Sequence, residues 1–181
     1  MISQANIKDN KQLESMAQQL STMVKKAVYM CIGTEKVCAD SLGPLVGQML
    51  NDNMESPVFV YGIYGYNITA QNVESCHRFI RKLHPDCTLV VIDAGVGEAD
   101  QIGSIQLTDG KIVPGAATDK SLCAVGDVTL VGIVSHKDMQ DFYSDSADKQ
   151  NLVQKTAHKI VRMILSAHSQ LAESAKENGL K

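Results

Sequence analysis

The sequence predicts an α/β fold, a three-layer α/β/α sandwich with a mainly parallel sheet. Apolar runs typical of strands alternate with amphipathic segments typical of helices along most of the chain. The strand-like runs are continuously apolar, as expected for a sheet that helices cover on both faces. The 181 residues, 44% of them hydrophobic, suffice for a sizeable core, so we assign residues 1–181 to a single domain.

The chain is predicted to begin with a helix, a strand and a second helix. Apolar residues recur at helical spacing over 10–26, and Asp9 or Asn10 is available as the N-cap. A strand follows over 27–32. The second helix carries Pro44 in its first turn, where proline is tolerated because no intrahelical donor is needed there.

The alternation continues with a short strand over 58–61 and a third helix. Asn72 is available to cap this helix, and Pro85 ends it. Residues 88–92 then form an apolar run typical of a buried strand, which ends directly in Asp93.

The second half departs from simple alternation. Residues 103–107 and 111–113 flank Thr108-Asp109-Gly110, which predicts a β-hairpin added antiparallel to the sheet. Residues 127–134 predict another strand. The chain closes with a long amphipathic helix, whose last residues, 172–181, we expect to fray.

Composition and charge exclude several classes of function. The net charge of −3, the pI near 5.9 and the lack of a Lys/Arg cluster argue against a nucleic-acid partner. No signal-peptide pattern opens the chain, and no apolar run approaches the roughly 20 residues that span a bilayer. Five scattered cysteines without C-x-x-C spacing suit a reducing compartment. We therefore expect a cytoplasmic protein with no membrane partner.

Asp40 and Asp93 are the candidate catalytic residues. Each follows an apolar, strand-like run within a cluster of small residues. Because ligands bind beyond the carboxyl ends of strands in open α/β sheets, both carboxylates are expected to act on one substrate. Two nearby carboxylates cannot both ionise cheaply, so one of them keeps a proton.

The division of labour between the two acids rests on their position. For peptide hydrolysis we favour Asp93, on the stiffer strand end, as general base and Asp40 as the group that polarises the carbonyl. The reverse stays open, because a coupled pair titrates as a unit. The structural alternatives are a helix N-cap or first-turn acid for Asp40 and an acceptor of loop N–H bonds for Asp93.

Five further residues are predicted to bind substrate. Gly33 and Gly95 would let the backbone approach a ligand closely, and Thr34 adjoins the first of them. Gly115 lies in an aperiodic loop, where a simple turn is the alternative. His136 follows the last predicted strand; it is a candidate third metal ligand beside the two acids, but a surface or hydrogen-bonded histidine is the commoner case. The spacing matches no compact metal motif, so we predict neither a metal nor a cofactor.

Several strings resemble known families. Residues 33–44, Gly-Thr-Glu-Lys-Val-Cys-Ala-Asp-Ser-Leu-Gly-Pro, resemble the G-N-x(5)-D-A-L-G-P segment of the spore germination protease, and Ile92-Asp93-Ala94 resembles its second acidic motif. Pro114-Gly115-Ala116-Ala117 is similar to its P-G-S-G loop. Nearly the whole chain resembles the YyaC-type sporulation proteins, which share the D-x-L-G-P-L-V-G string. Hydrogenase maturation proteases, related in fold, place a Glu and an Asp where the two acids fall.

The resemblance implies a phosphorylase/hydrolase-like α/β fold, as in hydrogenase maturation proteases, and an aspartic-type endopeptidase with Asp40 and Asp93 as its dyad. It also implies a sporulation-associated protein in the developing spore or mother cell, acting on a peptide or spore-protein substrate. A homo-oligomer is compatible with this. Thr34 replaces the usual Asn, and the chain is shorter than germination protease. A catalytically silent protein-binding relative and a metal-dependent maturation-type protease therefore stay open.

Overall fold

The computed structural model describes residues 2–53, 58–114 and 123–177. Within these ranges the strands are β1 (Ile2–Asn6), β2 (Ala27–Cys31), β3 (Phe59–Tyr61), β4 (Thr88–Gly97), β5 (Ser104–Asp109) and β6 (Val128–His136). The helices are α1 (Asn10–Met23), α2 (Leu42–Asn53), α3 (Val73–Leu83), α4 (Met139–Tyr143) and α5 (Ala147–Glu177), with a 3-10 turn, η1 (Ala39–Ser41), before α2.

One six-stranded sheet runs through the molecule in the order β1-β5-β6-β4-β2-β3. Neighbours β3, β2, β4 and β6 pair in parallel, whereas β5 is antiparallel to both β6 and β1. The predicted mainly parallel sheet is confirmed. Its parallel strands bring the end of β2 beside the middle of β4, because Cys31 pairs with Ile92 and β4 continues to Gly97. Asp93, expected just after the strand, lies within it, because residues 93–97 go on pairing with β6.

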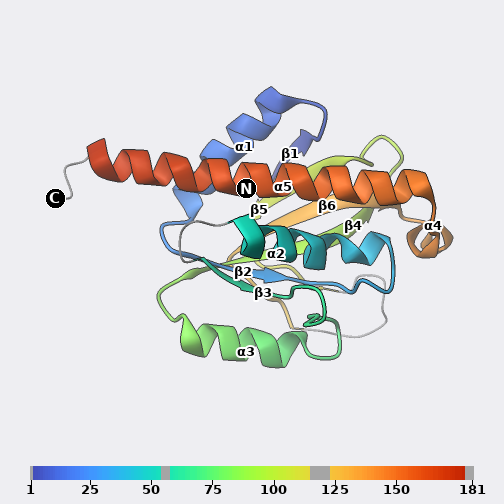
Figure 1. Cartoon of the computed structure of the whole chain (residues 1–181), viewed down its shortest axis with the longest axis horizontal. Helices are drawn as coiled ribbons and strands as arrows, with labels where there is room; N and C mark the ends of the chain where they lie inside the picture. Colours follow the sequence, from blue (N-terminus) through green and yellow to red (C-terminus); the bar gives the residue numbers. More distant parts are fainter. Residues whose placement is uncertain (1, 54–57, 115–122, 178–181) are drawn as a thin grey trace.

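Helices cover the two faces of the sheet unequally. Helices α1, α2 and α5 share one hydrophobic core with one face, and α3 packs in a second, smaller core on the other (Figure 1). The second core covers the β3, β2 and β4 side, with Ile80 of α3 against Leu89 and Val91 of β4. Beyond it, the same face of β5 carries polar residues such as Gln106 and Thr108, which need no apolar cover.

The predicted hairpin is wrong, although its antiparallel character is right. β5 pairs over its whole length with β6 and β1, which lie far from it in sequence, and Ile112 forms only an isolated bridge to Val125. The physical reason is that pairing on both sides satisfies the backbone of β5 while Ile105 and Leu107 enter the core. The local preference of Asp-Gly for a turn contributes much less free energy than this pairing.

Both ends of the described chain also differ from expectation. Strand β1 has no counterpart in the sequence prediction, because its residues are mostly polar and exposed at the sheet edge and form no apolar run. Helix α1 ends at Met23, three residues before the predicted end, and the side chain of Asp9 caps it by accepting from the N–H groups of Lys11 and Gln12. Helix α5 runs to Glu177, so most of the segment expected to fray is helical. None of the described helices is long and apolar enough to cross a membrane.

Candidate active site

The connection between β2 and α2 holds Asp40 by its backbone. Gly33 adopts a φ of 134°, and a Cβ at this position would lie 2.0 Å from the Asp40 carbonyl oxygen. The Thr34 N–H donates to that same oxygen at 3.1 Å. Only glycine permits this close crossing of the chain. Gly33 and Thr34 thus fix where η1, and with it Asp40, leaves the end of β2.

Asp93 lies on the neighbouring strand β4 at the same level. Cys31 pairs with Ile92 and the Ile32 N–H donates to the Ile92 carbonyl at 2.8 Å, which sets Ile32 beside Asp93. Asp93 is two residues from Val91 and so lies on the same face of β4, the face that α3 covers. Its exposure is only 7%, and its Oδ1 accepts the Ala94 N–H at 2.8 Å. This hydrogen bond is the structural role that the sequence offered as the alternative for Asp93.

Burial and mutual repulsion separate the two acids in their proton affinity. Burial, and then the negative charge of Asp40, raise the pKa of Asp93 to about 8 against the pull of the Ala94 hydrogen bond. Burial also raises the pKa of Asp40, while a hydrogen bond from the Thr34 backbone opposes the change. Asp93, the more completely buried acid, therefore has the higher proton affinity of the two. This order favours the reverse of the roles that we preferred from the sequence.

Asp40 is also a first-turn acid of η1, as its structural alternative required. Unlike Asp93 it is only partly buried. The pair thus consists of a partly buried acid and a buried acid with the higher proton affinity. Such a pair can take a proton from water and supply one to a substrate.

Gly95, predicted to contact substrate, has a packing role in the structure. A Cβ on Gly95 would lie 2.4 Å from Val131 Cγ1 and 2.9 Å from Ile133 Cδ1 on β6. The missing side chain makes room for β6. Gly115, the other predicted glycine, lies outside the described residues.

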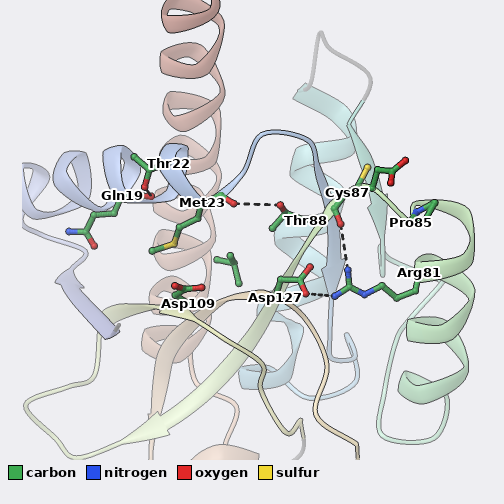
Figure 2. Close-up of a pocket in the computed structure, with 11 residues that line it drawn as sticks. Gln19, Thr22, Met23, Arg81, Pro85, Cys87, Thr88, Asp109 and Asp127 are labelled. Atoms are coloured by element: carbon green, nitrogen blue, oxygen red, sulfur yellow. Dashed lines mark hydrogen bonds and ion pairs between the residues drawn. The ribbon is translucent and has the colours of Figure 1, made fainter.

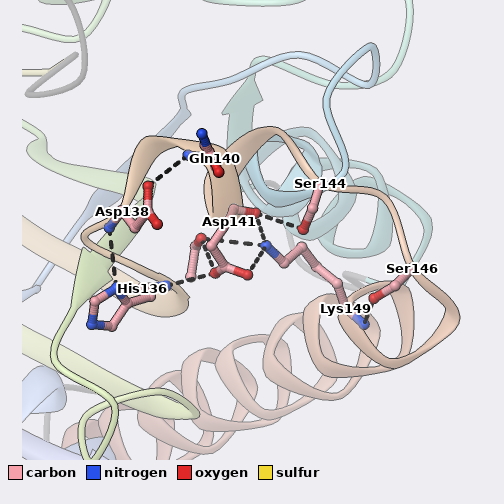
Figure 3. Close-up of polar contacts among 8 residues, drawn as sticks. His136, Asp138, Gln140, Asp141, Ser144, Ser146 and Lys149 are labelled. Atoms are coloured by element: carbon pink, nitrogen blue, oxygen red, sulfur yellow. Dashed lines mark hydrogen bonds and ion pairs between the residues drawn. The ribbon is translucent and has the colours of Figure 1, made fainter.

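His136 does not join the two acids. It pairs with Gly97, whereas Asp93 pairs with Val131, so it lies four residues further along β4, or about 13 Å at about 3.3 Å per residue. Its Nδ1 accepts the Asp138 N–H at 3.2 Å (Figure 3). Its Nε2 lies 4.0 Å from a carboxylate oxygen of Glu98. His136 is thus a hydrogen-bonded histidine, the alternative that the sequence left open.

A polar cluster beside His136 was not found from the sequence. Lys149, with 7% of its side chain exposed, lies 3.1 Å from Asp141 Oδ1 and donates to Ser135 Oγ at 3.3 Å and to the Asp141 carbonyl (Figure 3). Ser135 donates to Asp141 Oδ2 at 2.6 Å. Hydrogen bonds from Ser135 and the His136 backbone, helped by Lys149, lower the pKa of Asp141 to about 2.

This group, the Lys149 cluster (Ser135, Asp141 and Lys149), fastens α4 and the start of α5 to the end of β6. Ser135 is fully buried and its hydroxyl is already donated, so it is not an available nucleophile. The residues come from three elements, and no local spacing in the sequence indicates their meeting. We assign the cluster a structural role.

A cavity of about 750 Å³ opens at the other end of the sheet (Figure 2). It lies where β4 and β6 begin, with Thr88 and Val128 in its wall. Arg81 crosses it to reach Asp127 at 2.5 Å and the Cys87 carbonyl at 3.5 Å. The cavity is separated from the two acids by the length of the strands, so it is no part of their site.

Comparison with known proteins identifies the family. The model of the family described as "Protein of unknown function (DUF1256)" matches residues 4–163. The chain belongs to this family. It is 35% identical over 144 residues to the uncharacterized protein YyaC of Bacillus subtilis (strain 168), a match over 77% of this chain and 70% of YyaC. The predicted YyaC-type relationship is confirmed.

A solved structure shows the fold of this DUF1256 member. The NiFe hydrogenase maturation protease HycI from Thermococcus kodakarensis KOD1 is similar with a TM-score of 0.51 and 17% identity, over 81% of this chain and 98% of that chain. At this identity the likeness concerns the fold alone. It confirms the predicted hydrogenase-maturation-protease-like α/β architecture.

The described residues do not suit a metal site. They include no group of three or more His, Cys, Asp or Glu side chains placed to hold an ion. His136, the third ligand considered from the sequence, has one ring nitrogen occupied by a backbone N–H and the other facing Glu98. The metal-dependent alternative therefore finds no support in this arrangement.

Proposed function

We propose that this protein is an endopeptidase whose acidic dyad, Asp40 and Asp93, hydrolyses a peptide bond. The observation that supports the proposal most is the electrostatic asymmetry of the pair. A buried acid with a pKa of about 8 lies on β4, and its pKa is raised by a more accessible acid in the connection that follows the adjacent parallel strand β2. Strongly perturbed carboxyl groups in such a place are typical of catalytic pairs.

In this mechanism Asp40 acts as the general base. Its carboxylate takes a proton from water, whose oxygen attacks the scissile carbonyl carbon. Asp93 uses Oδ1 to accept the Ala94 N–H, which leaves Oδ2 to carry the proton that it donates to the developing oxyanion. When the tetrahedral intermediate collapses, the proton on Asp40 passes to the leaving amine, and the hydroxyl that Asp93 protonated returns its proton to Asp93 as the carbonyl reforms. Both acids are thereby restored.

The proposed substrate is a protein or peptide, with small acid-soluble spore proteins as the first choice because of the resemblance to germination protease. The proposed setting is the cytoplasm of the developing spore or mother cell. A catalytically silent binding protein is the second candidate. It is favoured by the low exposure of Asp93, 7%, which limits contact between this acid and a substrate.

The test compares wild type with Asp40→Asn, Asp93→Asn and the control Asp52→Asn. Asp52 is an exposed acid on α2 whose side chain accepts from Gln48 and Asn51. Each purified protein is incubated with small acid-soluble spore proteins and with peptide libraries, and products are read by mass spectrometry. We expect cleavage by wild type and the control, and its loss in both dyad variants. Cleavage that survives both dyad substitutions contradicts the mechanism; binding without cleavage indicates the silent binder.

A further inference from the structure

Two exposed tyrosines lie on a turn beside the dyad. Residues 63–66 form a tight turn in which the Tyr66 N–H donates to the Ile63 carbonyl at 3.0 Å. Gly65, the third residue of the turn, has a φ of 79°, as a type II turn requires. Tyr64 is 41% exposed and Tyr66 is 78% exposed. We call residues 63–67 the tyrosine turn.

The tyrosine turn is fastened to the loop that positions Asp40. Hydrogen bonds from the backbone of Glu35 itself, from the Asn67 side chain and from the Gly65 backbone lower the pKa of the Glu35 carboxyl. Asn67 Nδ2 also lies 3.4 Å from Thr34 Oγ1. The Gly33 N–H donates to the Ile68 carbonyl at 2.8 Å just after the turn. Gly33 and Thr34 in turn contact the backbone of Asp40.

The turn also lies on the face of the sheet to which Asp93 belongs. Ile68 pairs in parallel with Ile32 and is buried in the same core as Val91. Val91 and Asp93 share one face of β4. The tyrosine turn, Asp40 and Asp93 are therefore neighbours at one corner of the sheet, although three separate segments supply them.

A buried acceptor at this junction has no partner among the described residues. Because a carboxylate only accepts, the Asn67 amide must direct Nδ2 toward Glu35, which leaves Oδ1 on the other side. Asn67 Oδ1 is buried and makes no hydrogen bond there. Such an unmet buried acceptor costs free energy in the free protein.

We propose that the tyrosine turn is the substrate-binding arm of the dyad and holds an extended polypeptide segment by its apolar side chains. This inference rests on the proposed function and adds the class of ligand: an unfolded segment of a protein. Tyrosine is enriched where proteins bind one another, because its ring buries a large area at little cost in side-chain entropy and its hydroxyl stays hydrated. Fastening by Glu35 keeps both rings in place before the ligand arrives.

The experiment measures binding and turnover separately. Random 12-residue peptides displayed on phage are selected against the Asp40→Asn variant, and enriched peptides are synthesised with a fluorescein label. Fluorescence anisotropy then compares Tyr64→Ala/Tyr66→Ala with Tyr143→Ala, each in the Asp40→Asn background. Tyr143 is a matched control because it is 60% exposed on α4. We expect Kd to rise roughly tenfold or more in the double variant and to stay unchanged in the control.

A conservative double variant, Tyr64→Phe/Tyr66→Phe, keeps both rings and is expected to bind as tightly as the parent. This result separates a lost contact from a disturbed fold. For peptides that wild type cleaves, removal of both rings should raise KM and leave kcat unchanged. Failure to enrich any binding peptide, or an equal Kd with and without the rings, overturns the arm.

The outcomes distinguish the arm from the dyad. Cleavage with a KM that does not depend on the two tyrosines leaves the proposed hydrolysis standing and overturns the arm. Binding that depends on the tyrosines, without cleavage by wild type, supports the arm and overturns the hydrolysis.

Discussion

Replacing Asp93 with asparagine should stabilise the protein at neutral pH. In the folded state burial and the charge of Asp40 raise the pKa of Asp93 from 3.8 to about 8. Between these values the unfolded chain has lost the proton that the folded chain retains, so the free energy of unfolding falls as pH rises. At about 1.36 kcal/mol per pKa unit, this difference corresponds to a ceiling of about 6 kcal/mol. This ceiling is reached at about pH 8; at pH 7 only the interval from 3.8 to 7 counts, which gives about 4 kcal/mol. Relaxation of the site and entry of water lower the measured value, so we expect about 2–4 kcal/mol at neutral pH.

The assay is urea unfolding of wild type and Asp93→Asn at pH 4, 6, 8 and 9. The stability gained by the variant should be small at pH 4, grow up to about pH 8 and then level off. Asp127→Asn is the control of opposite sign: although burial raises the pKa of Asp127, hydrogen bonds from Arg81 and the Leu89 backbone hold it below its usual value. Removal of the Asp127 carboxylate should therefore lower the free energy of unfolding at neutral pH. An Asp93→Asn effect that is the same at pH 4 and pH 9 would refute the reasoning.

Three more predictions concern the site and its support. Asp40→Asn removes the negative neighbour and should lower the pKa of Asp93, measured by carbon-detected NMR titration of its carboxyl; an unchanged pKa would show that the acids do not interact. Lys149→Ala should cost about 1–3 kcal/mol in urea unfolding, less than for a fully buried ion pair because the carboxylate partner is partly exposed, and a cost near zero would contradict the role of the Lys149 cluster. Gly95→Ala should cost about 1–3 kcal/mol, because its Cβ would clash with Val131, and adding Val131→Ala should recover part of that loss if the clash is the cause.

Local sequence patterns predicted the structure correctly where neighbouring residues determine the secondary structure of a segment. Three features follow from residues within a few positions: the N-cap of α1 by Asp9, the apolar runs within β2, β4 and β6, and the end of α3 before Pro85. Asn72 shows the limit of this approach. It precedes α3 as expected, yet its side chain makes no capping hydrogen bond there; its Oδ1 accepts from Thr69 and its Nδ2 donates to the Asn67 carbonyl.

Pairing between distant segments was not legible in the sequence. The Thr108-Asp109-Gly110 turn indicated a hairpin, but β5 gains two partners by pairing with β1 and β6. The Lys149 cluster and the tyrosine turn likewise join residues that have no common spacing. The free energy of such long-range pairing depends on which segments of the chain meet. The local conformational preference of a segment is too weak to determine its partner.

The sequence by itself placed Asp40 after one apolar run and Asp93 at the end of another, and parallel pairing of the two strands brings the acids together. In the structure β4 continues past Asp93 to Gly97, because this part of the strand pairs with β6. Only the tertiary structure decided which acid keeps its proton, because this depends on how completely each carboxyl is removed from water and on how close the other charge lies. It also decided that His136 lies along the strand from the two acids, because register between β4 and β6 sets that separation.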